Sequence, residues 1–179
     1  MQEETRAALE TAEKVFADHA EPAALWATLE ETGLTLAATP EDQGGAGLPP
    51  EAVFALHRTA GAAAAPAPFA ETLTARRLLA AAGIAAPEGP LAFAAGASVA
   101  AGRLTADLPE VAFGGEAGHV VVLAEAEGAP RLALARASQA DARPVVTAGE
   151  DPEADLTFDA APIVAEAPVH WDAEALEAE

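Results

Sequence analysis

The side chains that most often carry out chemistry are few in this sequence, and they lie far apart. The chain has 179 residues and no cysteine, and its four histidines are His19, His57, His119 and His170. No two of them have the i, i+4 spacing that places zinc ligands on one helix face. Ser98 and Ser138 do not lie in a G-x-S-x-G turn, so neither is predicted to be a nucleophile. The sequence therefore predicts no metal site and nominates no catalytic residue.

The most distinctive local pattern is the glycine-rich stretch Thr39-Pro-Glu-Asp-Gln-Gly-Gly-Ala-Gly-Leu48. Gly44, Gly45 and Gly47 allow positive φ and a close approach of the backbone to a neighbouring group. That neighbour is a ligand or a subunit in one interpretation, and another helix at a tight turn in the other. The stretch does not satisfy G-x-G-x-x-G, because Pro50 takes the place of the third glycine and no βαβ unit surrounds it. A Rossmann-type dinucleotide site is therefore excluded.

Four helices are predicted to position this loop. The first spans about residues 3–19, and the second spans about residues 24–33 and ends at a C′ glycine. A third helix begins after Pro50, and a fourth runs over about residues 73–82 and stops at a glycine. Large apolar side chains at helical spacing stabilise a fold when buried. We therefore assign three of them to the core: Trp26, Phe54 and Leu78.

The pattern changes near residues 83–90, after which short β-like runs are separated by Gly, Pro and Asp. These runs are residues 91–94, 102–104, 119–124, 131–135 and 155–158. The fold class is thus predicted to be α+β, with a helical domain preceding a small antiparallel β-domain or barrel. The expected domains are residues 1–86, residues 87–169 and the start of a further helix at residues 170–179.

The charge is strongly one-sided, with 9 Lys and Arg against 29 Asp and Glu and a formal net charge of −20. Nucleic acid is a poor partner for such a surface, because phosphate binding needs clustered cations and only Arg76-Arg77 places two together. The N-terminus lacks a basic region followed by an apolar run, and the alanine-rich stretches are too short to cross a bilayer. We therefore expect a cytoplasmic protein with no membrane partner.

Two blocks of the first half resemble a known family. Trp26…Gly33-Leu34…Thr39 to Leu48 looks like the N-terminal helical domain of the flavin-dependent acyl-CoA dehydrogenases, and residues 61–72 are similar to the family's G-R-x-x-A-P-x-P-x-x-E-T segment. More loosely, residues 109–122 and 155–162 resemble the family's middle β-domain. The resemblance implies a helical domain followed by a β-domain that lays strands against FAD.

The resemblance also implies site residues and partners. Phe113 and Gly114 are expected near the flavin, and Gly44, Gly45 and Gly47 near the acyl-CoA substrate. The family's T-E-P-x-A-G-S-D segment is missing, since residues 89–102 offer only Ser98 as a hydroxyl donor. No residue maps to the family's glutamate base, which lies in a C-terminal helical domain of which only the first residues are expected here.

We therefore expect one subunit of a hetero-oligomeric, FAD-dependent acyl-CoA dehydrogenase that desaturates an acyl-CoA thioester. A longer acyl-CoA dehydrogenase-type subunit would supply the base and most FAD contacts, so that the cofactor binds only in the complex. The alternative is a non-catalytic acyl-CoA-binding or protein-interaction module on the same scaffold. The hetero-oligomer interpretation predicts an apolar face that another chain covers, whereas a stable monomer would favour the alternative.

Overall fold

A computed structural model describes residues 3–147 and 152–169 of the chain. Four α-helices come first, and two short 3-10 helices lie between the second and the third. The helices are α1 (Glu3–Asp18), α2 (Pro22–Glu31), η1 (Leu34–Leu36), η2 (Glu41–Gln43), α3 (Pro50–Ala62) and α4 (Phe69–Ala81). The strands are β1 (Leu91–Ala100), β2 (Arg103–Ala112), β3 (His119–Ala126), β4 (Ala129–Arg136), β5 (Asp141–Val145), β6 (Glu153–Pro162) and β7 (Ala165–Pro168), with η3 (Ala137–Gln139) before β5. The predicted helix at residues 170–179 lies outside the described residues.

Local chemistry accounts for the ends of α2. Pro22 stands at the first turn, where its missing N–H removes no helical hydrogen bond. The Glu21 carboxylate accepts a hydrogen bond of 3.0 Å from the Ala24 amide and so caps the helix. Gly33 follows the helix at φ 73°, the left-handed conformation that favours glycine. These signals explain why the helix was predicted within two residues of its observed bounds.

The helices pack around one apolar cluster. The rings of Phe16 and Phe69 meet edge to face with centroids 5.3 Å apart. Trp26 and Leu78 are partly buried against apolar clusters, as predicted. The prediction for Phe54 is wrong, since 66% of this residue is exposed. The buried face of α3 includes Leu56, and a residue two positions away points about 200° around the helix.

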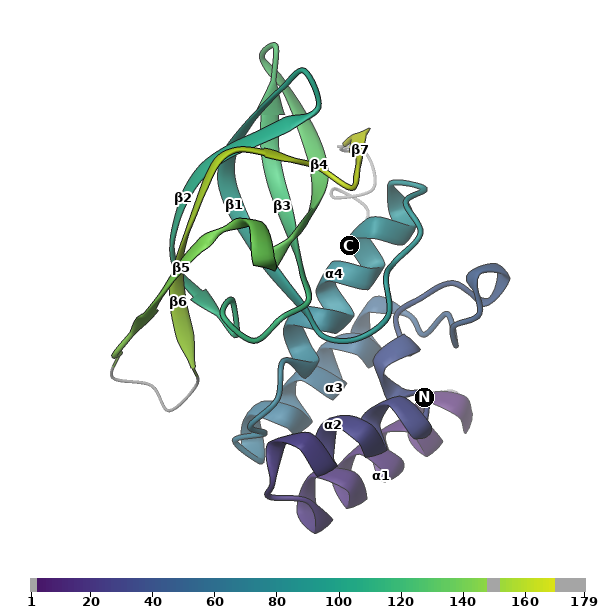
Figure 1. Ribbon diagram of the computed structural model, residues 1–179. Helices are drawn as coiled ribbons and strands as arrows, with labels where there is room; N and C mark the ends of the chain where they lie inside the picture. The colour runs from purple at the N-terminus through teal and green to yellow at the C-terminus, as the bar shows by residue number, and fades with distance from the viewer. Residues whose placement is uncertain (1–2, 148–151, 170–179) are drawn as a thin grey trace.

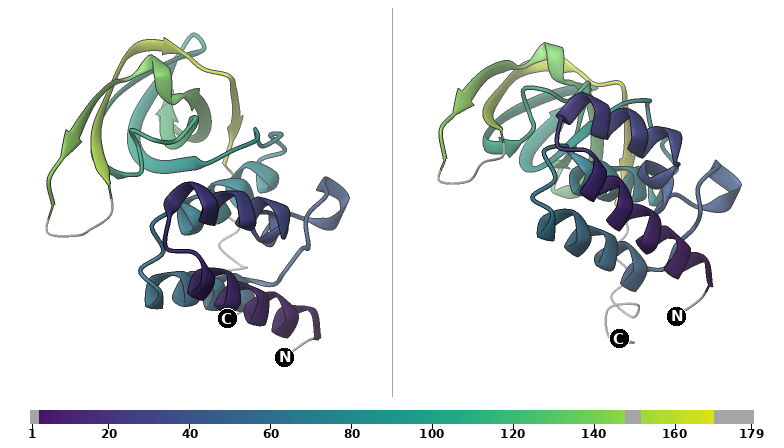
Figure 2. Two further views of the ribbon diagram at one scale, coloured as in Figure 1. Left: turned by 60° about the horizontal axis from the view of Figure 1, so that its bottom comes forward. Right: turned by 90° about the horizontal axis from the view of Figure 1, so that it is seen from below.

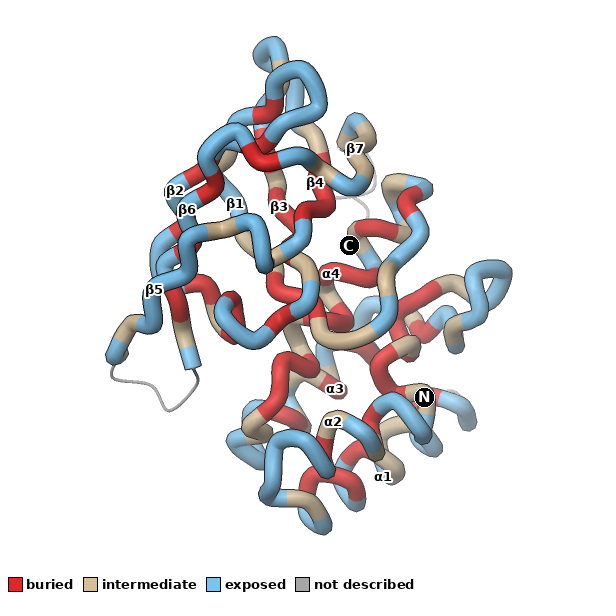
Figure 3. The backbone as a smooth tube through the Cα atoms, viewed as in Figure 1, coloured by how far each residue is buried: buried red, intermediate tan, exposed pale blue. Residues whose placement is uncertain are grey.

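The seven strands form one strongly curved sheet in the order β5-β6-β2-β1-β3-β4-β7 (Figures 1 and 2). All neighbouring pairs are antiparallel except β1 and β3, which run parallel with Leu91 opposite His119. The predicted order, a helical domain followed by a mostly antiparallel β-domain, is confirmed. Buried segments line the inside of the curved sheet and the inner faces of the helices (Figure 3).

Strand β2 is longer than predicted and continues through a bulge to Ala112. Leu104, Ala106 and Leu108 alternate inward, and the register then shifts before Val111. Glu110 lies in this bulge at φ 50°, and its amide donates a hydrogen bond of 3.0 Å to the Asp155 carboxylate. The bulge turns the strand away from a flat ladder. It leaves residues 109–110 exposed at the side of the sheet that faces α4.

Helix α4 joins the helical layer to the sheet, as Figure 1 shows. Thr72 is fully buried, and its hydroxyl accepts a hydrogen bond of 3.0 Å from the Leu91 amide at the start of β1. The same hydroxyl lies 3.4 Å from the Leu91 carbonyl, to which it donates. Ala75 and Leu79 of α4 belong to an apolar cluster with Leu91 and residues of β3 and β4. These contacts fix α4 against β1 and so define the space between the two layers.

Candidate functional site

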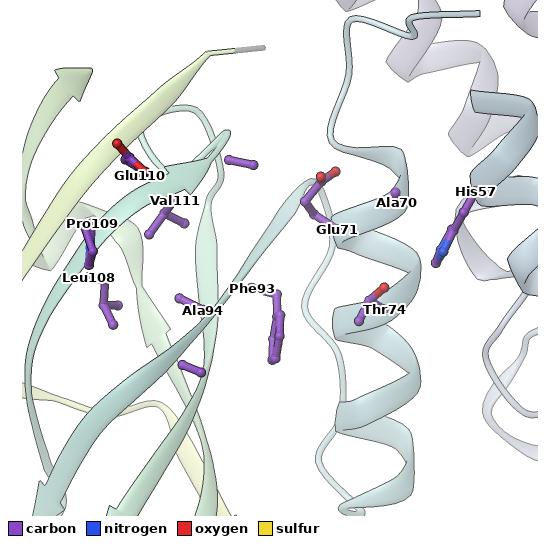
Figure 4. A pocket seen from close by; sticks show the side chains of 12 residues that line it. His57, Ala70, Glu71, Thr74, Phe93, Ala94, Leu108, Pro109, Glu110 and Val111 are labelled. Carbon is purple, nitrogen blue, oxygen red and sulfur yellow. The ribbon is translucent and has the colours of Figure 1, made fainter. Parts of the chain in front are cut away.

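The space between the helices and the sheet contains a cavity of about 490 Å³. Figure 4 shows that its walls come from three places, with His57 on α3, a second group on α4 and a third on β1 and β2. The α4 residues are Ala70, Glu71 and Thr74, and the strand residues are Phe93–Ala95 and Leu108–Ala112. The cavity thus combines an apolar strand wall with a few polar groups, which is typical of small-molecule sites. We refer to it as the interdomain cavity.

His57 is the most perturbed polar group in this cavity. Its Nε2 atom is buried and has no hydrogen-bond partner within the described part of the chain. Burial lowers the pKa of His57 below its ordinary value, because desolvation disfavours the charged ring. The imidazole is therefore neutral near pH 7.

A neighbouring cavity of about 370 Å³ brings one predicted residue to the same region. His57 and Glu71 line both cavities, and Phe113 lines the second. Phe113 is only 3% exposed and has φ 53°, and its amide donates a hydrogen bond of 2.7 Å to the Pro152 carbonyl. Gly114 follows in the turn, where an added Cβ would lie 3.0 Å from the Val111 Cβ. The structure therefore explains Gly114 by packing, and its contact with a flavin stays a prediction.

The glycine loop is not part of the interdomain cavity, whose lining comes from α3, α4, β1 and β2. Gly44 and Gly47 have φ 84° and 57°, and Gly45 lies against the turn that precedes the loop. A Cβ added at Gly45 would lie 2.1 Å from the Thr39 carbonyl oxygen. The three glycines thus allow a tight interhelical turn, and their predicted contact with an acyl chain stays a prediction.

Solved structures with a similar backbone identify the fold. The Tcur3481–Tcur3483 steroid ACAD, where ACAD denotes acyl-CoA dehydrogenase, matches with a TM-score of 0.72 and 25% identity over 93% of this chain. The ChsE4–ChsE5 complex from Mycobacterium tuberculosis matches with a TM-score of 0.71 and 20% identity over 92% of it. The fold is that of the acyl-CoA dehydrogenases. This confirms the family resemblance that the sequence indicated.

The acyl-CoA dehydrogenase fold also matches a glutaryl-CoA dehydrogenase from Mycobacterium smegmatis in complex with FADH2, with a TM-score of 0.62 and 11% identity over 94% of this chain. The chain spans 57%, 56% and 54% of the three matched structures. No protein-family model and no curated protein sequence matches it significantly. The match therefore shows the fold of this chain, and the activity, substrate and partners of a whole acyl-CoA dehydrogenase do not follow from it.

Sequence reasoning missed the residues that line the interdomain cavity of this acyl-CoA dehydrogenase fold. His57, Thr74 and Glu110 are 17 or more residues apart in the chain and carry no local motif. The one available signal was Pro109-Glu110, which interrupts the alternation of a strand and so marks a bulge. Thr72 closes the segment that resembles G-R-x-x-A-P-x-P-x-x-E-T, but that pattern does not predict its hydrogen bond to a strand.

Within residues 3–147 and 152–169, no group of three or more His, Cys, Asp or Glu side chains is arranged to hold a metal ion. Among the helices that the structure describes, none has the length and apolar character needed to cross a membrane.

Proposed function

We propose that this chain is a subunit of a hetero-oligomeric, FAD-dependent acyl-CoA dehydrogenase. The supporting observation is the match to two hetero-complexes, ChsE4–ChsE5 and Tcur3481–Tcur3483, at TM-scores of 0.71 and 0.72. The glutaryl-CoA dehydrogenase, at 0.62, matches less well. The reaction would be α,β-desaturation of an acyl-CoA thioester, in which a base removes the α-proton and FAD accepts the β-hydride.

The interdomain cavity is the proposed location of the reacting groups. Phe93, Ala94 and Ala95 contribute apolar lining to the cavity, against which one face of a flat isoalloxazine ring would pack. Across the cavity, the neutral His57 ring offers a polar atom that has no partner within the described part of the chain. It would bond to a polar group of the bound molecules and help to orient them.

A partner chain is proposed to supply the base and most FAD contacts. The cavity residues of β1 are Phe93, Ala94 and Ala95, none of which has a side-chain hydrogen-bond donor. A flavin has polar edges whose hydrogen bonds must be satisfied once it is buried. Donors from a second, longer acyl-CoA dehydrogenase-type subunit would satisfy them, which makes FAD binding dependent on assembly.

The test is co-expression of this chain with an acyl-CoA dehydrogenase-type subunit encoded beside it. The purified complex is analysed by light scattering for mass, by absorbance for FAD, and by acyl-CoA oxidation with an artificial electron acceptor. Ala95→Trp should fill the cavity without disturbing the core, because Ala95 is exposed. Ala27→Trp places the same side chain at an exposed position of α2 and is the matched control.

We expect a yellow complex that oxidises acyl-CoA, while the chain alone binds no FAD. Ala95→Trp should lose FAD or turnover, and Ala27→Trp should keep both. A stable, colourless monomer that ignores the second subunit would support the binding module instead. Normal FAD content and turnover in assembled Ala95→Trp would show that the interdomain cavity is not the site.

A further inference from the structure

A further cavity, of about 420 Å³, lies beside the glycine loop and shares no lining residue with the interdomain cavity. Leu36, Thr39 and Gln43 line it on the loop side, and Arg76 of α4 and residues 83–86 line it on the other. We refer to it as the loop cavity. It combines one cationic side chain with two neutral polar ones.

Arg76 is a buried cation that forms no ion pair with the residues that the structure describes. The residue is only 7% exposed, and its Nε has no hydrogen-bond partner within the described part of the chain. No carboxylate of residues 3–147 or 152–169 forms an ion pair with it. Burial lowers the pKa of Arg76, and the more distant charges of Glu30 and Glu88 oppose that shift. Since arginine stays protonated in proteins, the site holds a buried positive charge whose Nε lacks an acceptor among the described residues.

Thr39 adds a second unsatisfied group to the same cavity. Its hydroxyl oxygen is buried and lacks a partner within the described part of the chain. The glycine loop holds this residue in place, because the Gly47 amide donates a hydrogen bond of 2.8 Å to the Thr39 carbonyl. Gly45 lies directly against Thr39, where any side chain would collide. The loop therefore holds Thr39, with its unsatisfied hydroxyl, in the lining of the cavity that contains Arg76.

From this arrangement we propose that the loop cavity binds a carboxylate group through Arg76, with Thr39 and Gln43 as additional hydrogen-bond donors. The guanidinium fork matches the two oxygens of a carboxylate, and such charge-assisted pairs are the strongest hydrogen bonds in proteins. A single cation near Glu30 and Glu88 favours a monoanion over doubly charged phosphate, because each added negative charge is repelled by those two residues.

The carboxylate comes either from a free organic acid or from an Asp or Glu side chain of a neighbouring subunit. Both sources present the same head group to Arg76. The proposal does not depend on FAD or on acyl-CoA turnover, so it can fail while the proposed function holds.

The first experiment measures urea unfolding of the full chain in sodium acetate and in sodium chloride at equal ionic strength. Acetate should raise the unfolding midpoint in a saturable way, beyond any effect of chloride. In Arg76→Gln, the acetate concentration that gives half of this rise should be at least about tenfold higher, because a hydrogen-bonded charge is lost. Arg77→Gln removes the same charge from the adjacent, exposed position and should keep the response.

Thr39→Val is the second variant, for the case in which Arg76→Gln does not fold. It removes the hydroxyl but keeps the shape, and it should also weaken the acetate response. Equal effects of acetate and chloride on the wild type would overturn the proposal. So would equal responses of Arg76→Gln and Arg77→Gln, or an unchanged response in Thr39→Val when Arg76→Gln is unfolded.

The second experiment separates the two sources in the co-expressed complex. Competition of acetate with assembly, together with weaker assembly of Arg76→Gln, would identify a carboxylate of the neighbouring subunit. If neither acetate nor Arg76→Gln weakens assembly, and the chain keeps its acetate response in urea unfolding, the carboxylate comes from a free acid. Either result supports the carboxylate site, and a complex in which acetate binding is independent of Arg76 contradicts it.

Discussion

Replacement of Gly45 by alanine is the sharpest test of the glycine loop. An added Cβ would lie 2.1 Å from the Thr39 carbonyl oxygen, 2.5 Å from the Thr39 Cβ and 2.6 Å from the Leu36 carbonyl oxygen. Two of these three atoms belong to the backbone and cannot move like the end of a flexible side chain. The loop must therefore separate from the turn that precedes it.

The cost can be worked out from the hydrogen bonds that hold the loop to that turn. Four amides, from Gly45 to Leu48, donate to the carbonyls of residues 36–40 at 2.8 to 3.3 Å. Loss of two or three of these bonds, at about 0.5–1.5 kcal/mol each, predicts a destabilisation of about 1–4.5 kcal/mol. The larger Gly45→Val should cost more, because it adds two further carbons to the collision.

Urea unfolding followed by circular dichroism measures this free energy. Gly61→Ala is the matched control, because nothing lies within 4 Å of its added Cβ and its φ is not positive. That variant should be stabilised by about 0.5 kcal/mol, since alanine restricts the unfolded chain. If Gly45→Ala unfolds within about 0.5 kcal/mol of the wild type, the loop does not pack as described.

Two further predictions concern the sides of the interdomain cavity. Thr72→Val should lower the free energy of unfolding in urea by about 1–3 kcal/mol, because the buried Leu91 amide loses its acceptor. Thr72→Ser keeps the hydroxyl and should lower it less. Equal losses in the two variants would contradict the role of the Thr72–Leu91 hydrogen bond. Because burial lowers the pKa of His57 below 6.5, the unfolded chain binds more protons, so stability should fall as pH drops below about 6.5. His57→Gln should reduce the loss of stability at low pH without abolishing it, since burial and Arg136 also lower the pKa of His119. An unchanged pH dependence of stability would show that the burial of His57 does not contribute to it.

The helical half could be predicted from sequence because its signals are local. Apolar spacing, Pro22 and Gly33 define α1 and α2 without reference to any distant residue. The start of α4 was predicted at residue 73, although the helix begins at Phe69. Pro66 and Pro68 concealed those first residues, because proline at a helix start also fits a loop.

The β-half was predicted less completely. Strands β5 and β7 are edge strands of four or five residues with few buried side chains, so their sequence lacks the alternation that marks a strand. The parallel pairing of β1 with β3 has no local signal either. It depends on which strands meet after the chain has crossed the sheet.

By itself the sequence determined the order of helices and strands, the need for glycine at the tight loop, and the resemblance to one family. Only the tertiary structure decided that Phe54 faces solvent, that Thr72 joins α4 to β1, and that Arg76 and Thr39 line the same cavity. The physical reason is the range of each interaction. Helix periodicity and turn chemistry act over a few residues, whereas burial and shared cavities depend on groups that folding alone brings together.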